Sequence, residues 1–375
     1  MAGIYIHIPF CKQACTYCNF HFTVSQMHKA AMVRAIVKEI HQNNAFIADK
    51  NIETIYIGGG TPSICTVAEL ALILNAIYSK FGIIENAEIT LEANPDDISV
   101  AKLQEWKKLG INRLSVGVQS FNDAELKWMN RAHHATQSLQ CIADIKAAGF
   151  TNYSVDFIFG SPLQTNQILQ QNIEIIAAFD VPHVSCYALT VEKKTTLSKL
   201  IADKKTLDVD ADKQAAQFYL LLQLMEKYQY LQYEISSFCK PNYQSRHNSS
   251  YWQGKAYYGF GPSAHAYNGN NARRWNMANN GLYIQATQNN IPIYEEETLT
   301  EADQVNEYVM TALRTSEGIN LEKVKTLFGA LEMERIFKVA NKNIASSKVL
   351  INTTHIKLTN EGKFFADGIA GALFK

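Results

Sequence analysis

Three of the seven cysteines lie close together near the start of the chain, at Cys11, Cys15 and Cys18. Their spacing is C-x3-C-x2-C, and thiolates are soft ligands that suit iron–sulfur clusters and zinc. Three is an odd number and nothing in the chain indicates secretion, so a disulfide framework does not account for them. The motif therefore predicts a metal centre.

Two kinds of metal centre suit these cysteines. A structural zinc site needs four ligands; no fourth ligand stands at zinc-finger spacing, and His21, the alternative, sits in an aromatic run. A four-iron cluster on three thiolates leaves one iron open, and an open metal position can bind a substrate or cofactor. The residues favour the cluster, with zinc on His21 as the alternative.

The residues around the cysteines resemble a known family. Tyr17 precedes the last cysteine, and residues 5–11 read YIHIPFC. This pattern is similar to the signature of the radical S-adenosylmethionine (SAM) superfamily and, within it, of the oxygen-independent coproporphyrinogen oxidase-like proteins. The resemblance implies a [4Fe-4S] cluster on the three cysteines, and an open iron that binds the amino and carboxylate groups of SAM.

The cysteine loop follows a predicted strand, and the same strand-then-helix order recurs along the first half of the chain. The predicted strands are 3–8, 52–57, 88–92, 113–120, 153–159 and 184–189. The predicted helices are 26–46, 67–80, 100–109, 123–130, 136–148 and 167–178. This alternation predicts parallel strands with right-handed crossovers, an α/β fold. The resemblance implies an open (β/α)6 partial TIM-type barrel.

Polar and glycine residues recur where these strands end. Glu92, Gln119 and Asp156 stand at or near strand ends, and a glycine triplet at 58–60 follows the second strand. The carboxyl ends of parallel strands meet on one face, so a shared ligand explains the three polar residues. The resemblance assigns SAM contacts to Tyr5, Tyr17, Gly59, Gly60, Thr61, Glu92, Gln119, Arg131 and Asp156. Ala188 and His265 fall where some relatives contact a second SAM or a substrate.

The remaining chain divides into two parts. We expect a radical SAM core domain at 1–235, a connecting segment at 236–299 and a C-terminal HemN-like domain at 300–375. Residues 193–213 read as a mobile polar segment and 233–238 as one strand. Helices at 301–313, 321–328, 332–342 and 360–374, with a hairpin at 349–358, predict a mainly α, winged-helix-like module. Few cations cluster there, so a packing or substrate-covering role is favoured over DNA binding.

The family contains a dehydrogenase and a heme chaperone, and the sequence favours the chaperone. The enzyme carries a further cysteine two residues after the third, where this chain has Phe20, and a longer segment ahead of its cysteines. Residues 247–252 read HNSSYW and match the H-N-x-x-Y-W motif of the heme-binding branch. The resemblance implies that His247, expected on a loop, ligates heme that passes to heme-accepting proteins. Oxidative decarboxylation of coproporphyrinogen III is the alternative, and a radical SAM enzyme acting on another substrate is a third class.

Composition limits the partners. The chain has 375 residues, 47% of them apolar, and 35 basic residues balance 35 acidic ones. Zero net charge argues against a nucleic-acid footprint over the whole chain. We expect neither a signal peptide nor a transmembrane helix, because no apolar run reaches about 18 residues. The prediction is a cytoplasmic protein, with peripheral membrane contact left open.

Overall fold

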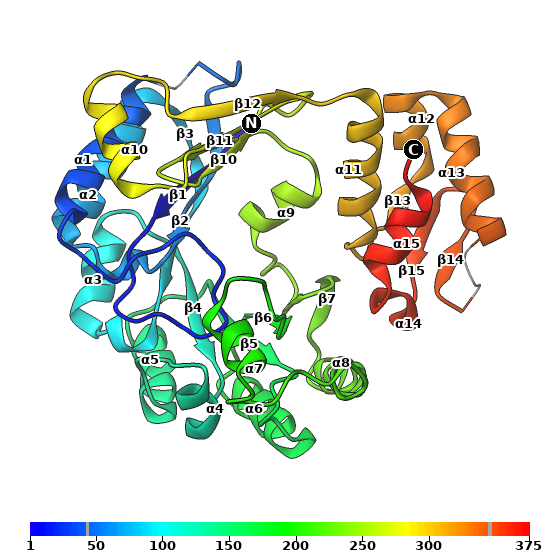
Figure 1. Cartoon of the computed structure of the whole chain (residues 1–375), viewed down its shortest axis with the longest axis horizontal. Coiled ribbons are helices and arrows are strands. Elements are labelled where there is room, and N and C mark those ends of the chain that lie inside the picture. Colours follow the sequence, from blue (N-terminus) through cyan, green and yellow to red (C-terminus); the bar gives the residue numbers. More distant parts are fainter. Residues whose placement is uncertain (43–44, 344–346) are drawn as a thin grey trace.

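A computed structural model of the chain describes residues 1–42, 45–343 and 347–375. At its centre, six strands lie side by side in chain order, and every neighbouring pair is parallel (Figure 1). They are β1 (Ala2–Ile8), β2 (Asn51–Gly59), β3 (Gly82–Ala93), β4 (Arg113–Gln119), β5 (Tyr153–Phe159) and β6 (His183–Ala188). The predicted open (β/α)6 arrangement is confirmed.

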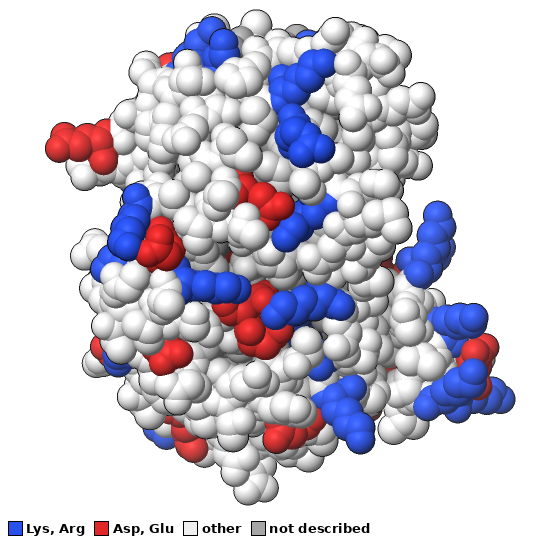
Figure 2. Space-filling model, turned by 90° about the vertical axis from the view of Figure 1, so that its left-hand side faces the viewer, with Lys and Arg blue, Asp and Glu red and all other residues white. Residues whose placement is uncertain are grey.

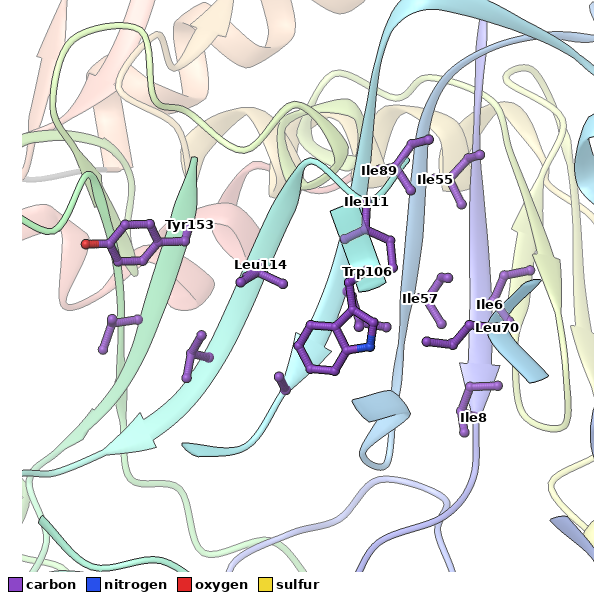
Figure 3. Packing of buried hydrophobic residues seen from close by; sticks show 14 of the residues in the cluster. Ile6, Ile8, Ile55, Ile57, Leu70, Ile89, Trp106, Ile111, Leu114 and Tyr153 are labelled. Atoms are coloured by element: carbon purple, nitrogen blue, oxygen red, sulfur yellow. The ribbon is translucent and has the colours of Figure 1, made fainter. Parts of the chain in front are cut away.

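Helices follow these strands and pack on one side of the sheet. They are α1 (Lys29–Gln42), α2 (Val67–Lys80), α3 (Val100–Lys108), α4 (Asp123–Trp128), α5 (Ala135–Ala147) and α6 (Asn166–Ala178), with single turns η1 (Pro62–Ile64) and η2 (Pro95–Asp97). Alternate apolar residues of the strands, such as Ile6 and Ile57, meet Leu70 and Trp106 of the helices in one buried core (Figure 3). Burial of this apolar surface holds the strand ends in fixed positions.

The sheet continues beyond the six parallel strands at both edges. Next to β6 lie β8 (Ser237–Cys239) and β7 (Leu231–Glu234), and next to β1 lie β9 (Tyr257–Phe260), β10 (His265–Tyr267), β11 (Ala272–Asn276) and β12 (Tyr294–Thr298). Helix α10 (Asn280–Gln288) packs against α1. Most of the segment expected to connect two domains, 236–299, therefore extends the sheet of the first, and the sheet stays open.

The last part of the chain has a hydrophobic core of its own. It comprises α11 (Glu301–Leu313), β13 (Ile319–Asn320), α12 (Leu321–Phe328), α13 (Ala330–Asn343), β14 (Val349–Ile351), β15 (His355–Leu358), α14 (Asn360–Lys363) and α15 (Ala366–Leu373). Helices around a small antiparallel sheet confirm the mainly α, winged-helix-like prediction. The single closing helix predicted at 360–374 is wrong, because it breaks at Phe364 and Phe365 into α14 and α15.

Three local expectations from the sequence are also wrong. The polar segment 193–213 contains helix α7 (Thr196–Ala202), whose Leu197 amide donates to the Thr16 carbonyl at 2.7 Å, and leads into α8 (Ala211–Lys227). The strand expected at 233–238 is a hairpin of β7 and β8. His247 stands not on a loop but in helix α9 (Arg246–Trp252). The end of the helix expected at 26–46 lies partly at 43–44, outside the described residues.

Charges of both signs are interspersed on the surface. On the face that carries α1, α2, α3 and α10, lysine and arginine side chains lie beside aspartate and glutamate side chains (Figure 2). This face therefore does not present the basic stripe typical of nucleic-acid-binding proteins. In the described ranges, no helix is both long and apolar enough to span a membrane.

Burial in the core predicts how much the free energy of unfolding falls when a core side chain is shortened. Trp106 is fully buried against the strands, so Trp106→Ala should lower the free energy of unfolding by about 3–5 kcal/mol through lost contacts and an uncollapsed cavity. Leu72→Ala on α2, where the side chain is mostly exposed, should change it by less than about 0.5 kcal/mol. Chemical denaturation followed by circular dichroism checks both values, and equal midpoints for the two variants would contradict this packing.

Candidate functional site

The cysteine loop is fixed by backbone contacts with the end of β2. The amides of Gly60 and Thr61 donate to the carbonyls of Ile8 and Phe10 at 2.8 and 2.7 Å. A Cβ atom added at Gly60 would come within 2.6 Å of the Phe10 carbonyl oxygen, so only glycine permits this approach. The loop is closed on its other side by Thr23, whose carbonyl accepts from the Cys11 amide at 3.0 Å. The glycine triplet thus places the loop over the strand ends.

A cavity of about 410 Å³ opens beneath the loop at the carboxyl ends of the parallel strands. It brings together most of the predicted site: Cys11, Cys15, Tyr17, Cys18, Gly59, Gly60, Thr61, Glu92, Gln119, Arg131, Asp156 and Ala188 all line it. This is the face on which parallel α/β folds gather ligand contacts from separate strands. The size lies within the range of cofactor-binding cavities.

The three thiols lie in a partly buried setting with hydrogen-bond donors. The Thr61 hydroxyl donates to Cys11 Sγ at 3.5 Å, and Arg131 Nη1 donates to Cys15 Sγ at 3.3 Å. Burial raises the pKa of the Cys11 thiol to about 11 and also raises that of Cys18. Thiolates here therefore require a cationic partner such as iron, and the two donors would then stabilise the sulfur charge.

The structure does not bring together the ligands of the alternative zinc site. His21 is absent from the cavity lining, and its Nε2 bonds Asn280 Oδ1 at 2.8 Å. Among the described residues, no three side chains of His, Cys, Asp or Glu converge on a position for a single ion. In a four-iron cluster each thiolate binds a different iron, so its ligands need not converge on one point. The donor set therefore suits a cluster better than a mononuclear site.

Two carboxylates, Glu92 and Asp156, line the cavity, and neither forms an ion pair with a described side chain. Glu92 accepts from Tyr56 Oη at 2.7 Å and from the Gly59 amide at 3.1 Å. Burial, with the nearby Asp156 charge, raises the pKa of Glu92 to about 7. Asp156 accepts from Ser115 Oγ at 3.1 Å, and burial raises its pKa as well. Such uncompensated carboxylates suit a ligand with positive charge, such as an ammonium or a sulfonium.

Arg131 and Gln119 also line the cavity, and each carries a buried polar atom without a hydrogen-bond partner among the described residues. Arg131 Nη2 donates to Asn94 Oδ1 at 2.7 Å and to the Gly117 carbonyl at 2.6 Å, while its buried Nε has no partner. Gln119 Oε1 is likewise buried without a partner, and the residue adopts φ 67°, which kinks the end of β4. Buried polar atoms normally have partners, so the two atoms are consistent with contacts to a polar ligand.

Three predicted residues lie outside the cavity. Tyr5 is a layer beneath it: its hydroxyl bonds His7 Nδ1 at 3.0 Å and its ring stacks on Tyr56. His265 lies exposed on β10, stacked on Trp275. His247 is buried in α9, where its ring nitrogens bond Thr54 Oγ1 and Tyr251 Oη, each at 2.8 Å. The contact roles of all three stay predictions.

Sequence reasoning missed several residues that shape the cavity. Tyr56 braces Glu92, Asn94 links Arg131 to the Thr61 hydroxyl, and Ser115 donates to Asp156. The signal that could have found them is the two-residue alternation along a strand. Side chains at positions i and i+2 of a strand share a face. Asn94, two residues after Glu92, and Ser115, four residues before Gln119, could therefore have been expected to line the same cavity.

Comparison with known proteins agrees with this geometry. Residues 5–176 match the model of the radical SAM superfamily. The heme chaperone HemW of Bacillus subtilis is 32% identical over 99% of both chains, and that of Lactococcus lactis is 31% identical over 96% of this chain and 93% of its own. The chain belongs to the HemW family of radical SAM proteins. Membership in the radical SAM superfamily implies a [4Fe-4S] cluster and SAM, and the cavity supplies thiols, carboxylates and an arginine suited to both.

The C-terminal region and a solved structure agree with that assignment. Residues 299–365 match the model of the HemN C-terminal domain. The fold matches the radical SAM enzyme coproporphyrinogen III oxidase (HemN) from Escherichia coli with a TM-score of 0.85, over 100% of this chain and 90% of that one. At 20% identity, this likeness establishes the shared fold and not a shared activity.

The geometry predicts which cysteines hold the cluster. After anaerobic reconstitution with iron and sulfide, wild type should contain about four irons per chain, and Cys15→Ala should lose most of them because no neighbouring thiol can replace it. Cys141→Ala is the matched control, since Cys141 is buried on α5 away from the cavity. Iron and sulfide analysis checks this, and a full complement in Cys15→Ala would rule out the assignment.

Proposed function

We propose that this protein is a heme chaperone that binds heme and passes it to acceptor proteins, with a [4Fe-4S] cluster and SAM in the strand-end cavity. The observation that carries the proposal is similarity along the whole chain to proteins named heme chaperone HemW in two bacteria. That similarity covers 99% of the chain and so extends beyond residues 5–176, which match the radical SAM model.

Each cofactor has proposed partners in the cavity. Cys11, Cys15 and Cys18 hold the cluster, whose open iron supplies a binding position for the amino and carboxylate groups of SAM. Glu92 and Asp156 face the positive charges of SAM, and Arg131 pairs with a carboxylate as a bidentate fork can. Gly59, Gly60 and Thr61 present backbone groups at close range. Ala188 lies on the wall that a second SAM or a substrate would contact.

The cavity lacks one feature that the family resemblance attributes to the dehydrogenase, the further cysteine after the third. Phe20 occupies the position of the further cysteine, lines the cavity and is 67% exposed. An apolar side chain there can neither bind iron nor donate a proton or hydrogen atom as a thiol can. This supports a carrier over a coproporphyrinogen dehydrogenase. We further propose that the protein acts in the cytoplasm on protein acceptors and not on nucleic acid.

The motif predicts His247 as the heme ligand, but its burial and the hydrogen bonds of both ring nitrogens weigh against that role. Its side chain is 1% exposed and stacks on Tyr56 with ring centroids 5.1 Å apart. Burial lowers the pKa of the imidazole to about 3, so the ring is neutral, as a metal ligand must be. To reach iron, the ring must give up its bond to Thr54 or to Tyr251.

Buried carboxylates predict a pH dependence of SAM binding. Glu92 is neutral below its pKa of about 7 and charged above it. Affinity for SAM, which carries ammonium and sulfonium charges, should therefore rise as pH increases from about 6 to 8. Glu92→Gln should flatten this profile and weaken binding by about 1–3 kcal/mol. Glu85→Gln, an exposed change on the same strand, is the control. Calorimetric titration checks both, and an unchanged profile in Glu92→Gln would remove Glu92 from the site.

Heme binding by wild type tests the proposed function, and a matched pair of variants tests the ligand. Wild type should bind about one heme per chain. If His247 ligates the iron, His247→Ala should shift the heme absorption band and weaken affinity at least about tenfold, whereas Tyr251→Phe removes one hydrogen bond and should keep the wild-type spectrum. Anaerobic absorption titration measures both. An unaltered spectrum and affinity in His247→Ala would show that the iron is bound elsewhere or not by histidine.

A further inference from the structure

A second cavity lies between the end of β6 and the C-terminal module. It has a volume of about 560 Å³ and is lined on one side by Phe159, Phe218 and Tyr187, and on the other by α14, α15 and the residues between them. We call it the interdomain slot. Tyr187, Ala188 and Thr190 line both the slot and the strand-end cavity, so the two spaces lie back to back across β6 and the residues that follow it.

Aromatic rings make up much of the slot. Phe364 and Phe365 stand where α14 gives way to α15, with ring centroids 5.6 Å apart and planes at 81°. Phe364 also lies 6.4 Å from Phe218 of α8, so the rings come from both parts of the fold. Phe364, Phe365 and Tyr187 are 42%, 44% and 46% exposed. Covering these rings with a flat apolar ligand would remove their surface from water.

The slot also contains two cations with weak or neutral partners. Lys363 Nζ bonds Gln232 Oε1 at 2.6 Å and Asn360 Oδ1 at 2.8 Å, both uncharged, and in the described chain no carboxylate lies within ion-pair distance of it. Burial lowers the pKa of this ammonium, which an anion would reverse.

Arg314 is the second cation. Its contacts with Glu234 and Asp367 are long, 3.8 and 4.0 Å, and its buried Nε has no hydrogen-bond partner in the described part of the chain. Asp367 also lines the slot, but its side chain is 90% exposed and can turn to solvent. Arg314 lies over the ring of Trp252, the last residue of the HNxxYW motif, at 5.2 Å. The motif is therefore in contact with the slot through Arg314.

We propose that the interdomain slot seats the tetrapyrrole, with the macrocycle against Phe364, Phe365 and Tyr187 and its two carboxylates at Lys363 and Arg314. This inference rests on the proposed heme function and names the site for it. A flat apolar ring with two carboxylates matches both features of the slot, and a free fatty acid or a single phosphate would match only one. Among the described residues, no histidine lines the slot.

A heme seated in the slot is not ligated by His247, which does not line it, so the two placements predict different ligand preferences. A slot that binds by ring face and carboxylates should take metal-free protoporphyrin IX with an affinity within about threefold of that for heme. A site that depends on an imidazole–iron bond should bind the metal-free ring poorly. A ligand held without a strong axial bond would also be free to move to an acceptor.

The test is a fluorescence-quenching titration of the full-length protein with heme, protoporphyrin IX and its uncharged dimethyl ester. Lys363→Met and Phe365→Ala should each weaken binding of heme and protoporphyrin IX about tenfold or more. Lys325→Met and Phe337→Ala, exposed changes elsewhere in the C-terminal module, should stay within about twofold. Wild type should prefer the free acid to the ester, and Lys363→Met should lose most of that preference.

The outcomes separate this inference from the proposed function. Wild type that binds neither heme nor protoporphyrin IX would overturn the heme function itself. Wild type that binds heme but rejects the metal-free ring, or slot variants that keep wild-type affinity, would overturn the slot alone. The comparison of acid with ester on wild type does not depend on how well any variant folds, and equal affinity for the two would exclude the proposed carboxylate contacts.

Discussion

The close approach of two backbones underlies the whole site. The end of β2 lies against the residue before the first cysteine, with the Thr61 amide donating to the Phe10 carbonyl at 2.7 Å. Gly60 makes the contact possible, because a side chain there would collide with the same backbone. This contact holds the cysteine loop in place, so that its thiols lie over the ends of the strands. The parallel strands, held by a continuous apolar core, then present their carboxylates and amides to the same cavity.

Buried charge without an opposing side chain marks both proposed binding regions. Glu92 and Asp156 line the strand-end cavity without a lysine or arginine paired to them in the described residues, and the half-buried Lys363 lines the slot with uncharged partners. Burying a charge in this way costs free energy unless a ligand compensates for it. The signs are opposite: one region suits a cation-bearing cofactor, and the other an anionic ring. Arg314 and the HNxxYW helix α9 lie between the C-terminal module and the sheet.

Most of the fold and the cavity could be predicted from the sequence because their signals are local. Strand and helix periods, the cysteine spacing and the glycine triplet each occupy a short segment, and all pointed to the strand ends where the structure has a cavity. His247 shows what local patterns miss. Its helix begins where Glu88, on a strand 159 residues earlier, accepts the His247 amide at 3.0 Å, so tertiary contact decided the conformation. Tyr56 resembled a core residue of its strand, and its hydrogen bond to Glu92 on the neighbouring strand could not be read from the local pattern.

The central claim is that a radical SAM fold here carries heme and does not oxidise its precursor. The most direct test is to incubate the reconstituted protein anaerobically with SAM, a reductant and coproporphyrinogen III, and to follow the porphyrin products by chromatography. The account predicts that the heme-binding protein leaves coproporphyrinogen III unchanged. Catalytic, SAM-dependent formation of protoporphyrinogen would contradict it and would identify the protein as a dehydrogenase.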